Sequence, residues 1–441
     1  ILPDVLPDRV RQHHQLCRIE YAYENIHFPE SAEALDLARR RLAFEELFFM
    51  QAGIWLLRKK REQGHTGIKC SPDGKLMLSV MKNIPFELTD DQKQVLVDIE
   101  SDMEGLVPMQ RLIQGDVGSG KTVIAALALA KIVVNGYQGA LMAPTEILAA
   151  QHYKTLSELY DGTGIRTELL IGQTRASEKK EILSRLASGE IDILVGTHSL
   201  IEDPVEFAHL GMVVTDEQHR FGVHQREDLS KKGKRPHVLV MSATPIPRTL
   251  AIMLYGDLDL SVIDELPANR LPIKNCVVDT SYRKSAYRFM QKEIAEGRQV
   301  YVICPMVEES EGLEAENVLD YTKKLRQEMP PEISVGFLHG RMKPAEKNKI
   351  MEEFSENKIQ ILVSTTVIEV GVNVPNATVM MVENAERFGL AQLHQLRGRV
   401  GRGEHQSYCI FMQGGEKKEI KERLQILVES NEGFFIAGDD L

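Results

Sequence analysis

The order of apolar and polar positions changes character along the chain. Between residues 31 and 63, apolar side chains recur at helical spacing, which predicts one long helix or two. The apolar positions of this segment are Leu35, Leu42, Phe44, Leu47, Phe48, Ile54 and Leu57. Its basic runs, at 39–41 and 58–61, are expected to form a solvated face in preference to a nucleic-acid contact. A polar, glycine-containing stretch at 64–74 then ends the helical pattern.

From about Met109, short apolar runs alternate with amphipathic helical runs. This alternation predicts parallel strands joined by crossover helices. The predicted strands form a first series at 111–114, 139–143, 191–196, 212–215 and 237–241, and a second series at 299–304, 334–338, 359–364, 378–382 and 407–411. The segment 265–272 between the two series contains Pro267 and Pro272, which suits a linker. We therefore expect two α/β lobes joined by one hinge.

Length and composition fit this architecture. The 441 residues are too many for one core, and 43% hydrophobic with 27% charged residues is typical of a soluble protein. No signal peptide and no run of eighteen apolar residues is visible, so we expect an intracellular protein. The chain starts with Ile1 and runs from a helical pattern into Gly438 and Leu441 without a stop signal. This indicates a segment of a longer protein.

Cysteines and net charge exclude some classes of site. The five cysteines lie far apart without a Cys-x-x-Cys pair, which favours reduced thiols over a metal centre or disulfides. The net charge of −11 counts mildly against a nucleic-acid partner, since phosphates are bound largely by Lys and Arg. A charge summed over a large chain can still hide a basic groove. Nucleic acid therefore stays possible as a partner.

The segment 115–122 carries a complete phosphate-binding motif between a predicted strand and a predicted helix. Its residues, all expected to bind nucleotide, are Gly115, Asp116, Val117, Gly118, Ser119, Gly120, Lys121 and Thr122. The glycines let backbone N–H groups surround phosphate at the positive end of the helix. Lys121 is expected to reach the β- and γ-phosphates, and the Thr122 hydroxyl to bind magnesium. The pattern predicts an ATP and Mg²⁺ site.

Two acidic residues follow the predicted strand 212–215. Ligands of open α/β sheets bind at the carboxyl ends of strands, which places Asp216 and Glu217 near the phosphate motif. Asp216 is expected to bind the magnesium, directly or through water, and Glu217 to polarise the attacking water. Adjacent acids are usually only solvated, but the apolar strand directs these two toward the phosphates.

The second lobe carries a basic segment at 395–402, with arginines at 397, 399 and 402. A solvated basic loop is the simpler interpretation. The glycines allow close approach, however, so the guanidinium groups of Arg399 and Arg402 can act across the lobe interface as arginine fingers. Upstream, Thr365 and Thr366 follow the predicted β-strand at 359–364. Their hydroxyls suit the phosphates of a bound nucleic acid.

These segments, in this order, resemble the superfamily 2 helicases, whose Asp-Glu-x-His box is similar to residues 216–219. The resemblance implies that Phe86 covers the adenine of ATP and that Gln92 hydrogen-bonds its edge. It also implies contacts to the sugar-phosphate backbone, made by Pro144, Thr145, Thr197 and His198. Residues 242–244 resemble the element that couples hydrolysis to movement.

The second lobe resembles the same superfamily. Gln395, Arg399 and Arg402 match its last motif, which implies catalytic roles for them beside Lys121 and Glu217. Gly371 and Asn373 would lie near the ribose. The superfamily often has Asp where this chain has Asn373, and both side chains can accept a ribose hydroxyl hydrogen bond.

Within the superfamily, residues 216–222, 241–249 and 389–395 resemble the RecG family of bacterial branched-DNA helicases. The nearest alternative is the transcription-repair coupling factors, which usually have Glu-Gln-Arg where this chain has 218–220 as Gln-His-Arg. A RecG-type enzyme would reverse stalled forks and migrate Holliday junctions. A further alternative is a nucleotide-gated module that clamps DNA without turnover. No barrel that splits the fork is visible in this chain.

The resemblance implies an α/β protein with two tandem RecA-like P-loop lobes and parallel sheets, preceded by a helical linker segment. The expected divisions are a helical linker at 1–84, an ATP-binding lobe at 85–266, a second lobe at 273–413 and the start of a helical hairpin region at 414–441. Branched or forked DNA is the implied partner, with single-strand DNA-binding protein as a further candidate. We expect a monomer without membrane contact, in the bacterial cytoplasm and associated with the nucleoid.

Overall fold

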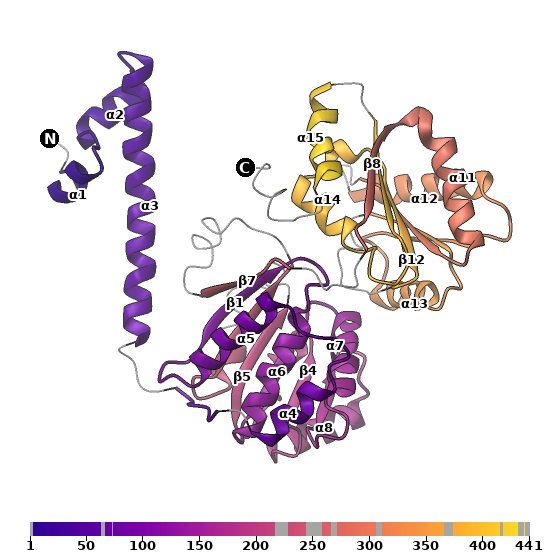
Figure 1. Ribbon diagram of the computed structural model, residues 1–441, viewed down its shortest axis with the longest axis horizontal. Helices are drawn as coiled ribbons and strands as arrows, with labels where there is room; N and C mark the ends of the chain where they lie inside the picture. The colour runs from indigo at the N-terminus through magenta and orange to yellow at the C-terminus, as the bar shows by residue number, and fades with distance from the viewer. Residues whose placement is uncertain are drawn as a thin grey trace. The chain divides into compact units, whose positions relative to one another are not determined.

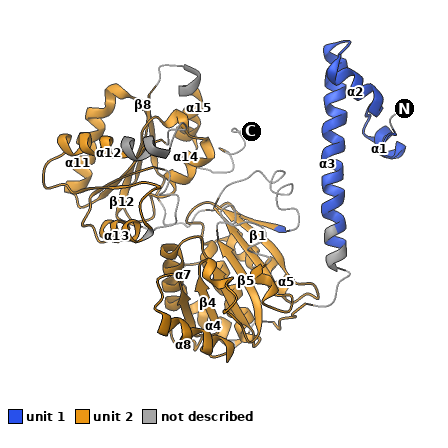
Figure 2. Ribbon diagram, turned by 180° about the vertical axis from the view of Figure 1, so that it is seen from behind, with its two compact units in different colours: residues 1–65, 248–259 blue, residues 66–247, 260–441 orange. Residues whose placement is uncertain are grey.

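The computed structural model describes residues 3–62, 67–72, 74–216, 228–243, 258–265, 271–305, 311–365, 374–414, 418–430 and 436. The chain divides into two compact units, which are coloured separately in Figure 2. The first comprises residues 1–65 with 248–259, and the second residues 66–247 with 260–441. Among the described residues, none of the helices is long and apolar enough to cross a bilayer.

The first unit is helical (Figure 1). Its helices are α1 (Asp8–His13), α2 (Ile19–His27) and α3 (Ala32–Glu62), and α2 packs on α3. The apolar periodicity between 31 and 63 therefore corresponds to one continuous helix of 31 residues.

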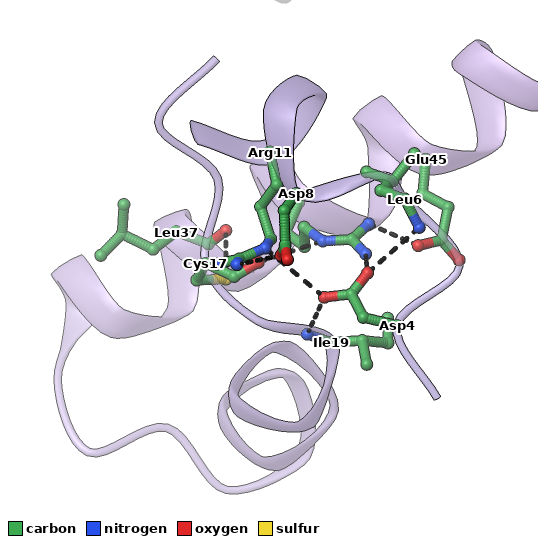
Figure 3. Close-up of polar contacts among 9 residues, drawn as sticks. Asp4, Leu6, Asp8, Arg11, Cys17, Ile19, Leu37 and Glu45 are labelled. Carbon is green, nitrogen blue, oxygen red and sulfur yellow. Dashed lines mark hydrogen bonds and ion pairs between the residues drawn. The ribbon is translucent and has the colours of Figure 1, made fainter. Parts of the chain in front are cut away.

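A buried arginine of α3 holds the start of the chain to this helix through ion pairs, and Figure 3 labels its two carboxylate partners, Asp4 and Glu45. The side chain of Arg41 is fully buried and forms ion pairs with Asp4, at 2.6 Å, and with Glu45. Its Nε also donates to the carbonyl of Cys17 at 3.1 Å. Burial alone would raise the pKa of Asp4, but hydrogen bonds from backbone N–H groups and the charge of Arg41 lower it. The expectation of a solvated basic face is therefore wrong for Arg41, because a buried guanidinium requires partners.

The basic run at the other end of α3 also has protein partners. Arg58 donates to the carbonyl of Leu258 at 2.9 Å and lies 3.4 Å from the carboxylate of Asp259, within the same unit. The ammonium group of Lys59 lies over the ring of Trp55, 4.9 Å from its centroid. These contacts account for part of the basic run without any nucleic acid.

The second unit contains two α/β lobes, each built on one sheet. In the first lobe, the described strands form a seven-stranded sheet in the order β3-β4-β2-β5-β6-β1-β7. The strands are β1 (Gln110–Gly115), β2 (Gln138–Met142), β3 (Thr167–Leu170), β4 (Ile193–Gly196), β5 (Leu210–Asp216), β6 (His237–Ser242) and β7 (Asp259–Ile263). The pairs from β3 through to β1 are parallel, so the carboxyl ends of these strands lie along one edge. All five predicted strands of the first series are confirmed within two residues.

Helices cover both faces of the first sheet because successive residues of its strands point to opposite sides. One face packs against α4 (Lys75–Lys82), α5 (Asp90–Met103), α6 (Lys121–Val134) and α7 (Glu146–Leu159), and the other packs against α8 (Ala176–Ala187). A short turn, η1 (His198–Leu200), follows β4. Helix α6 starts six residues after β1 ends, so the phosphate motif forms the connection between them.

The second lobe repeats this plan with a six-stranded sheet, in the order β10-β11-β9-β12-β13-β8 among the described residues. Its strands are β8 (Lys274–Asp279), β9 (Gln299–Ile303), β10 (Val335–Leu338), β11 (Ile361–Ser364), β12 (Ala377–Val382) and β13 (Tyr408–Gln413), all parallel to their neighbours. One face packs against α11 (Arg283–Ala295) and α12 (Glu311–Glu328). The other packs against α13 (Pro344–Ser355), α14 (Leu390–Arg397) and α15 (Lys418–Glu429). Two turns, η3 (Thr280–Tyr282) and η5 (Ala385–Arg387), complete the lobe, and the second strand series is confirmed.

Candidate active site

The phosphate motif forms a tight loop between β1 and α6. Gly118 and Gly120 have φ angles of 85° and 86°, in the left-handed region that favours glycine. A Cβ atom at Gly120 would also collide with the side-chain amide of Gln92. Gly120 caps α6 without any side-chain hydrogen bond, so the N-terminal N–H groups of α6 can serve an anion.

Lys121 lies on this loop with its charge turned inward. Its Nζ donates to the carbonyls of Gly115, at 2.6 Å, and Asp116, at 2.8 Å. The residue is only 9% exposed. A phosphate at the helix N-terminus would offer this ammonium group a charged partner in place of neutral carbonyls.

Gln92 rests on the loop from the neighbouring helix α5. Its Nε2 donates to the carbonyl of Ser119 at 2.7 Å. Its Oε1 accepts from the backbone N–H of Thr89 at 3.0 Å, and the Thr89 hydroxyl accepts from Gln92 N in return, which closes a capping box. Both halves of the amide therefore bind protein here. The adenine contact expected of Gln92 stays a prediction, as does that of Phe86, which lines the neighbouring cleft.

Asp216 is the last residue of β5 and is almost buried, at 8% exposed. Its Oδ2 lies 2.7 Å from Nε2 of His152 on α7. Glu217, Thr366, Gly371 and Asn373, which the sequence also assigns to the site, lie outside the described residues, as does Thr244. The roles expected of these residues stay predictions.

The basic segment of the second lobe meets the phosphate motif through close contacts. Its helix α14 ends at Arg397 and is capped by Gly398, where a Cβ atom would lie 3.0 Å from the Cβ of Val117. The close approach expected of these glycines therefore occurs at Gly398. Arg399 is 5% exposed, and the Nε of Arg402 donates to the carbonyl of Gly398 at 3.0 Å.

A polar chain runs from the same motif into the second lobe. Asp116 Oδ1 lies 2.9 Å from Nε2 of His394, and the other ring nitrogen accepts from Arg397 at 2.7 Å. Arg397 also donates to the carbonyls of Leu427, at 2.9 Å, and Ser430, at 2.8 Å, at the end of α15. Burial alone would raise the pKa of Asp116, but the hydrogen bond from His394 and nearby positive charges hold it below its usual value. Neither His394 nor Arg397 is among the residues that the sequence patterns predict for the site.

One cleft of about 350 Å³ is lined by nine of the residues predicted for the ATP site. Its lining includes Phe86, Val117, Gly118, Gly120, Lys121, Thr122, Asp216, Arg399 and Arg402. Gln92, Gly115, Asp116, Ser119 and Gln395 are not among its described lining residues. The lining also includes His152, which the sequence analysis missed. A cleft of this size is within the range of small-ligand sites.

The residues expected to touch nucleic acid lie at strand ends. Pro144 and Thr145 follow β2, and Thr197 and His198 follow β4, so all four lie at the carboxyl edge of the first sheet. The Thr145 hydroxyl caps α7, accepting from Leu148 N at 3.4 Å, and Thr197 is buried, whereas His198 is exposed. Thr365 follows β11, and its buried hydroxyl has no hydrogen-bond partner among the described residues. Their contacts to a nucleic acid stay predictions.

Two protein-family models match the lobes. Residues 89–252 match the DEAD/DEAH box helicase family, and residues 284–404 match the helicase conserved C-terminal domain. Along the whole chain, 49% of residues are identical to the ATP-dependent DNA helicase RecG of Synechocystis and 49% to that of Bacillus subtilis. The chain spans 53% and 64% of these two relatives, which is less than two thirds of their length.

A solved structure of RecG bound to a three-way DNA junction is similar over the whole chain, with a TM-score of 0.88 and 44% identity, and the chain covers 58% of it. A structure of S. cerevisiae Dbp5 bound to RNA and ADP BeF3 has a TM-score of 0.59 and 17% identity, over 83% of this chain and 92% of that one. That likeness shows the fold alone. Together with the two parallel sheets, these matches establish two tandem RecA-like lobes.

Proposed function

This chain belongs to the RecG family of ATP-dependent DNA helicases, and from that premise we propose that it is the ATP-driven motor of an enzyme that remodels branched DNA. Its activities would be the reversal of stalled forks and the migration of Holliday junctions. Both of these relatives are ATP-dependent DNA helicases, and this chain spans 53% and 64% of their length.

The observation that carries the ATPase part is one shared cleft. Lys121, Thr122 and Asp216 of the first lobe line it together with Arg399 and Arg402 of the second. Positive charge around the reacting phosphate stabilises the transition state of phosphoryl transfer, and this arrangement supplies such charge from both lobes. Gln395 lies on α14, just before Arg399 and Arg402 in the chain, and would support their catalytic role.

The residues present also fit a bound magnesium ion. A threonine hydroxyl and a carboxylate are hard oxygen ligands of the kind this ion prefers, and Thr122 and Asp216 line the same cleft. When bound, the ion would neutralise charge on the phosphates. Lys121 would hold the β- and γ-phosphates, and Glu217 would orient and deprotonate the attacking water.

We assign the remaining contacts by the same reasoning. Phe86 and Gln92 would recognise the adenine, and Gly371 and Asn373 would lie near the ribose. Five residues that follow strands at the carboxyl edges, where open sheets bind ligands, would contact the DNA backbone: Pro144, Thr145, Thr197, His198 and Thr365. Thr366, the next residue in the sequence, would share this role. The enzyme would act as a cytoplasmic monomer at the nucleoid, with single-strand DNA-binding protein as a candidate partner.

An ATPase comparison tests the substrate class. ATP hydrolysis would be measured on this chain and on the full-length Bacillus subtilis relative, each with a fork, a four-way junction, linear single-stranded DNA or RNA. We expect the branched substrates to stimulate hydrolysis most. Equal stimulation by all of them, or stimulation by RNA alone, would refute the branched-DNA part.

A single substitution tests the assigned base. We expect Glu217→Gln to retain nucleotide binding and to lose hydrolysis by several orders of magnitude, because the amide cannot accept the proton of the attacking water. Binding would be measured with a fluorescent ADP and hydrolysis by phosphate release. Unchanged turnover in this variant would remove Glu217 from the mechanism.

A further inference from the structure

A histidine occupies a core position of α7. Leu148, His152 and Leu156 are spaced four residues apart, so they share one face of the helix, and all three are buried. His152 is only 5% exposed. An apolar side chain would suit this face without further requirement, whereas a buried imidazole needs a hydrogen-bond partner.

The partner is the carboxylate of Asp216. Nε2 of His152 lies 2.7 Å from Oδ2 of Asp216, and both side chains are nearly buried, at 6% and 12% exposed. A carboxylate accepts hydrogen bonds, so the imidazole donates from Nε2. The contact therefore fixes the orientation of the carboxylate at the mouth of the phosphate loop.

Two rigid elements set this geometry. Asp216 ends β5, which lies between β2 and β6 in the middle of the sheet. Helix α7 starts four residues after β2 ends, and β2 is the parallel neighbour of β5. The hydrogen bond thus joins the end of β5 to the middle of α7. His152, Asp216 and Thr122 all line the same cleft.

We propose that His152 is a positioning residue, which holds Asp216 in the orientation that binds the magnesium of the Mg·nucleotide complex. This inference rests on the proposed function, since it takes Asp216 as a magnesium ligand. Side chains that orient a metal ligand typically change metal affinity about 10- to 100-fold when removed. A histidine that only filled space in the core would affect folding and leave the magnesium dependence unchanged.

The test measures equilibrium binding in the absence of turnover. A fluorescent ADP is titrated with MgCl₂ on the wild-type chain and on His152→Ala, His152→Gln and His152→Asn. A glutamine amide places an N–H group near the position of Nε2, whereas the shorter asparagine mimics Nδ1 and does not reach Asp216. The glutamine and asparagine variants therefore have similar polarity, but only the glutamine variant can form the proposed hydrogen bond to Asp216.

We expect His152→Ala and His152→Asn to need about 10- to 100-fold more Mg²⁺ for half-maximal enhancement of binding. His152→Gln should restore most of the wild-type midpoint, and binding of the fluorescent ADP without Mg²⁺ should be equal in all four proteins. His209→Ala, a substitution of an exposed histidine in the same lobe, serves as the control. Thermal melting checks that each variant folds.

Equal Mg²⁺ midpoints for wild type, His152→Ala and His152→Asn would overturn the proposal, and so would a shift in His152→Gln as large as that in His152→Asn. If His152→Ala does not fold, the comparison of glutamine with asparagine still decides. A wild-type chain that binds no fluorescent ADP at any Mg²⁺ concentration would refute the proposed ATP site itself. A wild-type chain whose ADP binding does not respond to Mg²⁺ would refute the assignment of Asp216 as a magnesium ligand, and the inference with it. The failure of the inference and that of the proposed function therefore give different results.

Discussion

His237 is a buried side chain whose contribution to stability depends on its protonation. It starts β6, is fully buried, and accepts from the backbone N–H of Met109 at 2.9 Å through Nδ1. Nε2 lies 2.9 Å from the carbonyl of Ile68, so the ring must be neutral with its proton on Nε2. Burial lowers the pKa of His237, because the charged ring would lose its hydration.

This lowered pKa gives a testable pH dependence. Above about pH 6.5, the ordinary value, His237 is neutral in both folded and unfolded chains and does not affect the balance. As the pH falls below that value, the unfolded state binds a proton that the folded state refuses, so stability decreases until the lowered folded pKa is reached. The free energy of unfolding of the wild type, measured with denaturant, should therefore decrease as the pH falls through this window. His237→Gln should show a shallower decrease, and an equally steep one would contradict the assignment; His209→Gln is the matched control.

Replacing His237 also has a cost at neutral pH. Met109 N–H and Ile68 C=O would lose their partner in His237→Ala, and an unsatisfied buried group costs about 1–3 kcal/mol. The glutamine variant offers a donor and an acceptor, so its loss of unfolding free energy above pH 6.5 should be the smaller of the two.

At the scale of the element, Arg41 connects α3 to the start of the chain. We expect Arg41→Ala to destabilise this helical unit by about 1–3 kcal/mol, because it removes the ion pairs with Asp4 and Glu45 and the donor to the Cys17 carbonyl. Hydrogen exchange of residues 4–27 would measure the effect directly. Arg39→Ala, at an exposed position on the same helix, should leave the exchange unchanged. Equal exchange in the two variants would show that the ion pairs do not hold this segment.

The elements also show where sequence patterns succeed and fail. All ten predicted strands are present, and most are buried over their whole length, so their apolar runs are continuous. The three that were not predicted, β3, β7 and β8, all lie at sheet edges. None of the six residues of β8 is fully buried. An edge strand with solvent on one side carries polar residues, which hide the pattern.

The candidate site divides in the same way. The phosphate motif, Asp216 and the arginines could be predicted because each belongs to a short local segment with its own chemistry. His152 and His394 could not, since their partners are 64 and 278 positions away in the chain. The local signal at His152 was a polar residue between Leu148 and Leu156 on a core-facing helix, which indicates a partner without identifying it. Arg41 gave no such signal, because a basic run on a helix is usually solvated.

At the scale of the whole second unit, Gly398 determines how closely α14 approaches the phosphate loop. Its φ of −64° suits any residue, so Gly398→Ala introduces a contact and no backbone strain. The new Cβ would lie 3.0 Å from the Cβ of Val117 and 3.2 Å from its Cγ2, so the two segments must move apart. We expect nucleotide binding to persist and turnover to fall by up to about 100-fold, since Arg399 and Arg402 would be displaced.

The measurement for this variant is ATP hydrolysis on branched DNA alongside binding of the fluorescent ADP. Gly53→Ala is the matched control, because nothing lies within 4 Å of a Cβ added there. Wild-type turnover in Gly398→Ala would mean that the close approach of α14 to Val117 is not needed for hydrolysis.

The close packing of Gln92 on Gly120 also limits which substitutions these two positions can accept. Glutamate at 92 could keep the helix cap but could not donate to the Ser119 carbonyl, and asparagine is too short to serve both partners. Any side chain at 120 would displace the amide. A substitution at either position therefore harms the other, and each would be tolerated only with a compensating change. Two positions that lie on different elements should be inherited together as one unit.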